Sequence, residues 1–340
     1  MSILLLYTEK FSGRILHLIF KKSVQSETTL TNLIAMKTFL IATLCLLLIH
    51  PVFAQNQQIE IKTSDGVKLH ITKKGEGMPV LYLHGGPGSG SYWFELFMGD
   101  YLEQHFQMIY LDQRGVGRSG SPDDGNFSLD RFLQDFEEIR VELGIETWIT
   151  MGHSFGGILQ TAYANRHPEA ISGMIMINAS LYMQGSFNES WCLKASEILE
   201  IPEPFPCRDE TLPLFDRWNT LIEELNENDL MWKMGFDNRE NLDKMNSTYR
   251  DISNWNSDFG NAFQDFEDFQ IDFRPLTNSL NMPVLFYYGT RDWMAGPEHY
   301  REIGFPNMLL WQGDTAHMPF LENKGDLIDA IESFMHKFGF

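Results

Sequence analysis

The chain has 340 residues, of which 43% are hydrophobic, enough to bury one large core or two modest ones. Its 26 basic and 46 acidic residues give a formal net charge of −20, which repels phosphate backbones and anionic membranes. The composition gives no indication of a fibrous or disordered protein and argues against nucleic acid as a partner.

The first segment with a recognisable pattern is an export signal. Met36-Lys37 precedes the apolar run TFLIATLCLLLI, and small residues follow at Val52 and Ala54. This pattern predicts a signal peptide over residues 36–54 and an exported protein, periplasmic or secreted, with no membrane insertion after cleavage. The alternative is a membrane anchor, but the run is shorter than the roughly 20 apolar residues that a spanning helix needs. Residues 1–35 are then a non-native upstream extension.

Strand and helix patterns alternate from residue 55 onward. Two short strands around Gly66 suggest a hairpin, and the segment PVLYLH that follows is apolar throughout, as in a buried parallel strand. Further strands are predicted at 107–112, 147–152, 173–178, 283–289 and 307–311, and helices at 128–143, with Ser128 as N-cap, and 325–340. The alternation predicts an α/β fold with a mostly parallel central sheet and helices on both faces.

The interval 181–280 lacks strand signals and is acidic and aromatic. We expect a helical cap here, inserted between late core strands over the carboxyl edge of the sheet, so that the core comprises 55–180 and 281–340. Within the cap, the spacing of Phe263, Phe266, Phe269 and Phe273 predicts the packing face of a helix.

The cap also holds the two cysteines that remain after signal cleavage, Cys192 and Cys207. In an oxidising compartment they are expected to form a local disulfide, with two separate buried thiols as the alternative. Neither has a neighbouring Cys or His at metal-binding spacing, and no metal site is predicted.

A candidate nucleophile lies at Gly152-His153-Ser154-Phe155-Gly156, between a predicted strand and a predicted helix. Gly-x-Ser-x-Gly in this context is a nucleophile elbow, in which the glycines permit a sharp turn that exposes the serine hydroxyl. His153 is expected to point away and to serve in packing.

A serine hydroxyl needs a base to take its proton and a third group to orient that base. Asp292 and His317 each follow a predicted late strand, in the chain order that this arrangement requires. The predicted roles are Ser154 as nucleophile, His317 as general base and then acid, and Asp292 as the carboxylate that fixes the imidazole tautomer. Asp314 is the alternative carboxylate, but its place on the same short loop as His317 favours a capping or solvated role.

The glycine-rich turn His84-Gly85-Gly86-Pro87-Gly88 follows an early strand. Such a loop supplies one backbone N–H to an oxyanion hole, and the residue after the nucleophile supplies the other. The predicted donors are Gly86, with Gly85 as the neighbouring alternative, and Phe155. Phosphate-loop and dinucleotide-binding patterns fit poorly, because Pro87 has no N–H and no lysine follows, and no cofactor is predicted.

Together, HGGPG at 84–88, DQRGVGRS at 112–119, the elbow, Asp292 and His317 resemble the α/β-hydrolase superfamily and, within it, the proline iminopeptidase-like serine peptidases. The resemblance implies an α/β-hydrolase fold and a mainly structural role for the DQRG segment. It also implies that cap glutamates hold the free amine of the substrate. The candidates are Glu189, Glu197, Glu200 and Glu203.

The elbow departs from the family pattern, because GHSFGG stands where proline iminopeptidases often carry Gly-Gly-Ser-Trp-Gly. The expected function is an exported aminopeptidase that releases N-terminal proline or a small apolar residue from short peptides through an acyl-enzyme. The alternatives are a carboxylesterase or amide hydrolase with the same triad and, from a different class, a catalytically inactive binding module. A small peptide or ester is the expected substrate.

Overall fold

The computed structural model describes residues 57–248 and 251–340. The upstream extension predicted at 1–35 and the signal peptide predicted at 36–54 lie outside the described residues. None of the helices in this part of the chain is long and apolar enough to cross a bilayer.

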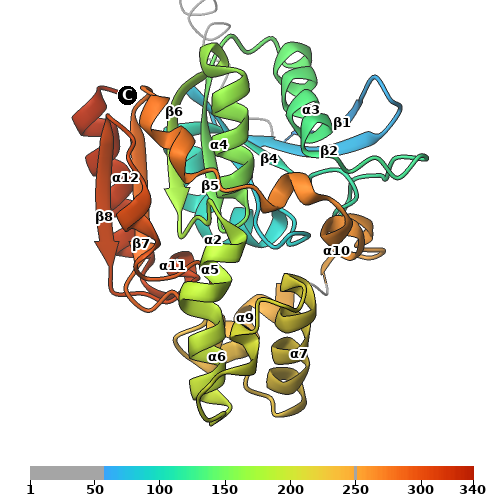
Figure 1. The fold of residues 1–340 in the computed structure, drawn as a ribbon. Coiled ribbons are helices and arrows are strands. Elements are labelled where there is room, and N and C mark those ends of the chain that lie inside the picture. Colours follow the sequence, from blue (N-terminus) through green and yellow to red (C-terminus); the bar gives the residue numbers. More distant parts are fainter. Residues whose placement is uncertain (1–56, 249–250) are drawn as a thin grey trace, which may run out of the picture. The chain divides into compact units, whose positions relative to one another are not determined.

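A single eight-stranded sheet forms the centre of the fold, in the order β1-β2-β4-β3-β5-β6-β7-β8 (Figure 1). Strands β1 and β2 form the predicted antiparallel hairpin, β2 pairs antiparallel with β4, and the remaining neighbours are parallel. The predicted α/β-hydrolase fold with a mostly parallel sheet is confirmed. The strands are β1 (Gln57–Lys62), β2 (Lys68–Lys74), β3 (Met78–Leu83), β4 (Phe106–Leu111), β5 (Trp148–His153), β6 (Ile171–Ile177), β7 (Val284–Gly289) and β8 (Met308–Gly313).

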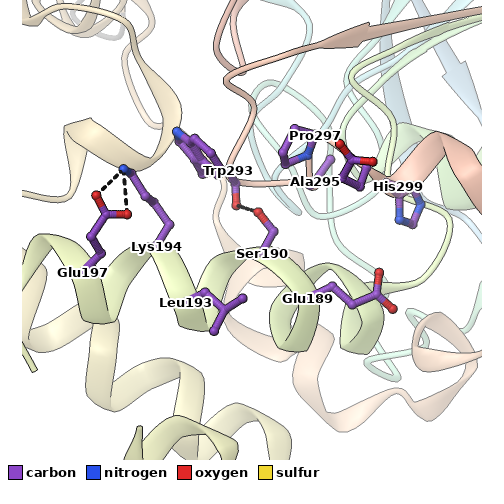
Figure 2. A pocket seen from close by; sticks show the side chains of 11 residues that line it. Glu189, Ser190, Leu193, Lys194, Glu197, Trp293, Ala295, Pro297 and His299 are labelled. Carbon is purple, nitrogen blue, oxygen red and sulfur yellow. Dashed lines mark hydrogen bonds and ion pairs between the residues drawn. The ribbon is translucent and has the colours of Figure 1, made fainter. Parts of the chain in front are cut away.

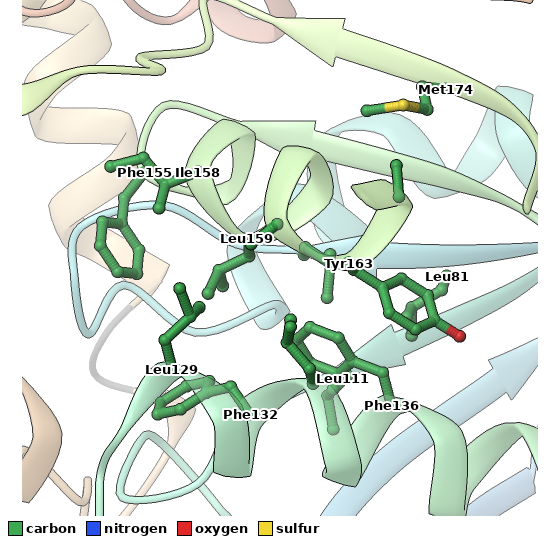
Figure 3. Packing of buried hydrophobic residues seen from close by; sticks show 14 of the residues in the cluster. Leu81, Leu111, Leu129, Phe132, Phe136, Phe155, Ile158, Leu159, Tyr163 and Met174 are labelled. Carbon is green, nitrogen blue, oxygen red and sulfur yellow. The ribbon is translucent and has the colours of Figure 1, made fainter. Parts of the chain in front are cut away.

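Helices cover both faces of the sheet because successive residues of each apolar strand point to opposite faces. On β3, Leu81 and Leu83 join one hydrophobic cluster, and Val80 and Tyr82 join another. Figure 3 shows the first cluster, in which α3 (Leu129–Glu142) and α4 (Gly156–Arg166) pack on the sheet. The second cluster lies under α2 (Tyr92–His105), α11 (Pro319–Glu322) and α12 (Lys324–Phe338).

Ser128 is the N-cap residue of α3, but its side chain makes no capping bond to the helix. Its hydroxyl instead donates to Asn126 Oδ1 at 2.8 Å. The N-cap residue of α3 is therefore the predicted one, but its side chain bonds to Asn126 in the preceding turn and not to the helix.

The chain between β6 and β7 is helical. It contains α5 (Met183–Ser186), the π-helical turn η2 (Phe187–Trp191), α6 (Cys192–Ile198), α7 (Leu214–Glu227), α8 (Trp232–Gly235), α9 (Arg239–Thr248) and α10 (Asp258–Ala262). Phe187, Trp191, Leu221, Leu225 and Met234 form a separate small core within this cap. A disulfide joins Cys192 to Cys207 beside that core, as expected.

The phenylalanine series of the cap does not lie on one helix, contrary to the expectation from its spacing. Phe263 begins the 3₁₀ turn η5 (Phe263–Asp265), Phe269 lies in η6 (Glu267–Gln270), and extended residues at Phe266 and Ile271 interrupt the helical path. Phe269 and Phe273 are nevertheless buried in the main core, where Phe269 contacts Phe155 with ring centroids 5.3 Å apart. The rings pack on the core from short turns because tertiary contacts, rather than helical periodicity, set their positions.

Candidate active site

Ser154 lies in the sharp turn between the end of β5 and the start of α4. Its φ of +56° is a left-handed conformation that non-glycine residues rarely adopt. The flanking glycines make room for this turn: a Cβ on Gly156 would lie 2.3 Å from the Leu83 carbonyl oxygen, and one on Gly152 would lie 2.2 Å from Gln160 Oε1. Ser154 remains partly exposed beside buried neighbours, as a nucleophile must be.

The structure brings Asp292 and His317 together. His317 Nδ1 lies 2.9 Å from Asp292 Oδ1, and both side chains are almost fully buried. The same carboxylate oxygen accepts hydrogen bonds from the backbone N–H groups of Met294 and Ala295, which fix its orientation. With Nδ1–H donating to Asp292, the other ring nitrogen of His317 is left to act as a base.

The alternative carboxylate, Asp314, is exposed and pairs with Arg291 at 3.2 Å. No hydrogen bond joins Ser154 to His317 within residues 57–248 and 251–340, and such contacts often tighten only when substrate binds.

His153 does more than pack, which corrects the expectation from sequence. The residue is buried, and its Nε2–H donates to the backbone carbonyl of His317 at 2.8 Å. Burial, reinforced by the neighbouring His317 ring, lowers the pKa of His153 far below its usual range, so this ring is neutral. His153, next to the predicted nucleophile Ser154, therefore holds the backbone of His317, the predicted base.

Two further residues that the sequence did not single out fix the loop that carries His317. Asn178, at the end of β6, donates from Nδ2 to the Ala316 carbonyl at 2.7 Å and accepts from the Gly289 N–H at 2.7 Å. Glu322, in α11, accepts from the Ala316 N–H at 2.5 Å and from the Met318 N–H at 3.4 Å. The loop is thus held on both sides of His317.

The glycine-rich loop lies directly against Ser154, the predicted nucleophile. A Cβ on Gly85 would come within 2.8 Å of Ser154 Cβ, so only glycine allows this approach. Gly86 has a φ of +112°, which glycine also favours. Within the described part of the chain, neither the Gly86 nor the Phe155 N–H donates a hydrogen bond. Both predicted oxyanion-hole donors are therefore available.

His84 and the DQRG segment hold this loop in place. The Gln113 N–H donates to His84 Nε2 at 3.2 Å, and Gln113 Nε2 donates to the His84 carbonyl at 3.1 Å. Burial lowers the pKa of His84 to about 4, so the ring is neutral and can accept this bond.

Asp112 anchors the next turn of the same loop. It accepts from the Ser91 N–H and hydroxyl at 2.8 and 2.7 Å and from Arg118 Nε at 2.7 Å. Burial acts to raise the pKa of Asp112, but the bonds from Arg118 and Ser91 outweigh it and hold the pKa at about 2. This buried anion fixes the chain just beyond the glycine-rich turn.

Two of the four glutamates considered for binding a substrate amine line a cavity of about 220 Å³ between the cap and the loop after Asp292. Figure 2 shows Glu189 and Glu197 on the cap side of this cavity and His299 on the opposite side. Glu197 is paired with Lys194 at 3.0 Å, whereas Glu189 lies 3.8 Å from Arg274. Glu200 and Glu203 are exposed and do not line the cavity.

The geometry fits acyl transfer at a serine. No three His, Cys, Asp or Glu side chains come together as metal ligands among the residues that the structure describes. The groups that fit acyl transfer are Ser154, the His317–Asp292 pair and the backbone N–H groups of Gly86 and Phe155.

Comparisons with known proteins agree with this fold. The family model for the α/β hydrolase fold matches residues 78–324. Proline iminopeptidase from Neisseria gonorrhoeae is 32% identical over 154 residues, covering 44% of this chain and 47% of that protein. The proline iminopeptidase of Arabidopsis thaliana is 28% identical over 179 residues, covering 50% and 46%. The chain thus spans about half the length of these relatives.

Solved structures show the same fold at lower identity. A proline iminopeptidase-related protein from Thermus thermophilus superposes with a TM-score of 0.67 at 20% identity, covering 83% of this chain and 98% of that one. An esterase from Thermogutta terrifontis superposes with a TM-score of 0.60 at 19% identity, covering 83% and 99%. At these identities the likeness describes the fold alone.

Proposed function

This chain belongs to the α/β-hydrolase fold family, and we propose that it is an exported serine hydrolase, an aminopeptidase that releases N-terminal proline or a small apolar residue from short peptides. The observation that carries the proposal is the 2.9 Å hydrogen bond between His317 and Asp292, beside a serine in a left-handed turn. Similarity to proline iminopeptidases over about half of their length supports the peptidase assignment.

In the proposed mechanism, Ser154 Oγ attacks the carbonyl carbon of the scissile bond while His317 takes the hydroxyl proton. The oxyanion that develops accepts hydrogen bonds from the N–H groups of Gly86 and Phe155. Collapse of the tetrahedral intermediate breaks the bond to the leaving nitrogen, which receives the proton from His317. A water molecule, deprotonated by His317, then hydrolyses the acyl-enzyme and restores Ser154.

Carboxylesterase or amide hydrolase activity is the second candidate. His153 stands where the peptidase family often has glycine. Of the cap glutamates considered for binding an amine, Glu200 is exposed and Glu197 forms an ion pair with Lys194. These features favour a hydrolase whose substrate has no free amine to be held.

The test of the catalytic assignment is Ser154→Ala. We expect loss of turnover of ester and amide reporters with an unchanged circular dichroism spectrum, because the Ser154 hydroxyl forms the acyl-enzyme in the proposed mechanism. His317→Ala is expected to cause a loss of similar order. Unchanged turnover in Ser154→Ala would refute the assignment.

The substrate class is tested by comparing proline, alanine and leucine arylamides with a short-chain aryl ester under the same conditions. Cleavage of the proline arylamide supports the aminopeptidase. Cleavage of the ester with no arylamide activity supports the second candidate instead.

Export is supported by the disulfide between Cys192 and Cys207, since such bonds persist mainly in oxidising compartments. Expression of the full chain in a secreting host, followed by N-terminal sequencing, tests it. A mature protein beginning at Gln55 is the expected result, and retention of residues 36–54 would contradict it.

A further inference from the structure

A second cavity, of about 310 Å³, lies between the cap and His317. It is lined by His317 and Met318 from the loop after β8, by Met294 from the loop after β7, and by cap residues that include Trp232 and Leu242. The volume is at the lower end of the roughly 300–1,000 Å³ range of small-molecule sites, which suits one side chain rather than a folded partner.

Six of the eleven residues that line this cavity have apolar side chains, and the polar ones include the exposed Asn226 and Asn246. Three methionines, Met231, Met294 and Met318, contribute to it together with Trp232 and other half-buried apolar side chains of the cap. Methionine side chains adapt to ligands of different shape. By contrast, the cavity of Figure 2 carries three glutamates and a lysine.

The charge at the edge of the apolar cavity is neutralised. Asp229 is the acidic side chain in its described lining, and it pairs with Arg239 at 2.6 Å while facing solvent. A ligand in the cavity would therefore meet mainly hydrophobic surface, together with His317 and two uncharged asparagines, and no unpaired charge in the described lining would hold an ammonium group.

The residues that line the cavity indicate which part of a substrate it would bind. Its lining includes His317 but none of the residues of the glycine-rich loop, nor Ser154 or Phe155. In acyl transfer the carbonyl oxygen lies at the oxyanion hole, and the atom that leaves must lie at the general acid that protonates it. A cavity that is lined by the general acid but by no residue of the oxyanion hole therefore lies on the side of the leaving group.

We propose that this cavity binds the leaving group and selects one that carries a bulky, uncharged, apolar side chain, which for a peptide substrate is the residue that follows the scissile bond. The proposal rests on the proposed function and adds specificity on the side opposite the acyl group. It needs no chemistry beyond the protonation of the leaving nitrogen by His317.

The first experiment keeps the acyl group constant and varies the leaving group. Proline, or the acyl group that the arylamide comparison identifies as preferred, is linked to the amides of glycine, phenylalanine, glutamate and lysine. We expect kcat/KM for the phenylalanine amide to exceed that for the glycine amide about tenfold or more, as for burial of an apolar group in a fitted pocket. The two charged leaving groups are expected to be poorer than phenylalanine.

The second experiment changes the wall. Leu242→Glu places a carboxylate in the lining, and we expect it to abolish the preference for phenylalanine and to favour lysine as leaving residue. Leu212→Glu is the matched control, because Leu212 is an exposed cap leucine outside the cavity. Asn246→Trp, at an exposed lining position, fills the cavity without a core change and should lower turnover of the phenylalanine amide but not of the glycine amide.

Deacylation separates this inference from the alternatives, because the leaving group has departed before that step. Equal deacylation rates in the parent chain and Leu242→Glu, with altered acylation rates, support the proposal. A flat leaving-group profile in an active enzyme, or an effect of Leu242→Glu on deacylation and acyl preference, would overturn it while leaving the serine hydrolase assignment intact. Failure of a fluorophosphonate to label Ser154, together with no turnover of any substrate, would instead refute the proposed function and with it this inference.

Discussion

Glu322 offers a pH-dependent test of how the His317 loop is held. Its carboxyl group accepts hydrogen bonds from the backbone N–H groups of Ala316 and Met318, the residues on either side of His317. Burial, followed by the charge of Asp237 in the cap, raises the pKa of Glu322 from 4.5 to about 7, although these backbone bonds act in the opposite direction. The perturbation is Glu322→Gln, measured across pH 4.5 to 8.

The sign of the effect follows from linkage. Below the unfolded-state pKa near 4.5 the carboxyl is protonated in both states and contributes no difference in free energy. Between pH 4.5 and about 7 the unfolded chain releases this proton while the folded chain retains it, so the free energy of unfolding falls as pH rises. At about 1.4 kcal/mol per pKa unit the full shift corresponds to about 3 kcal/mol. Since the group is partly open to solvent, screening reduces this to about 1–2 kcal/mol.

The assay is urea unfolding of the parent chain and of Glu322→Gln at several pH values. The glutamine cannot ionise, and it retains only one oxygen for the two N–H donors, which costs about 1 kcal/mol at acid pH. We therefore expect the parent to be the more stable protein at pH 4.5 and to lose this advantage by pH 8. Glu142→Gln, an exposed position on α3, controls for loss of a surface carboxylate. Stability curves for parent and Glu322→Gln that stay parallel across this range would refute the reasoning.

Two further substitutions test the elbow and its neighbour. Gly156→Ala should lower the free energy of unfolding by about 1–3 kcal/mol, because the added Cβ would lie 2.3 Å from the Leu83 carbonyl oxygen; Gly120→Ala, whose Cβ would lie no closer than 3.5 Å to its neighbours, should have little effect in the same denaturation assay. His153→Phe should lower kcat about tenfold with little change in KM, because the His317 carbonyl loses its partner, and His153→Gln, which can donate the same bond, should recover part of the loss. Equal kcat values for the two His153 variants would contradict the positioning role.

The parts of the site that sequence predicts are those with local signals. Gly-x-Ser-x-Gly between a strand and a helix encodes the left-handed turn at Ser154, because the glycines allow its close contacts. Asp292 and His317 follow late parallel strands, and the carboxyl ends of parallel strands meet at one edge of a sheet. The strands themselves are near-continuous apolar runs, as buried parallel strands require.

The parts that sequence did not reveal depend on contacts between distant segments. Asn178 has no motif of its own, yet it links the ends of β6 and β7 to the His317 loop. Phe269 and Phe273 follow a helical spacing but lie in short turns, because their burial against the main core is stronger than the weak local preference for a helix. Neither result could be obtained from periodicity, which carries no information on long-range partners.

His153 combines a local sequence signal with a contact between distant segments. In sequence it is a departure from the glycine that proline iminopeptidases often have before the serine. In the structure its side chain bonds to the His317 carbonyl, so the strand that leads into Ser154 also fixes the loop that carries His317. A glycine at this position could not make that bond, and the loop would lose one of several restraints, among which those from Asn178, Glu322 and Asp292 would remain. The departure that weakens the resemblance to the peptidase family is thus an added restraint between Ser154 and the residue proposed to take its proton.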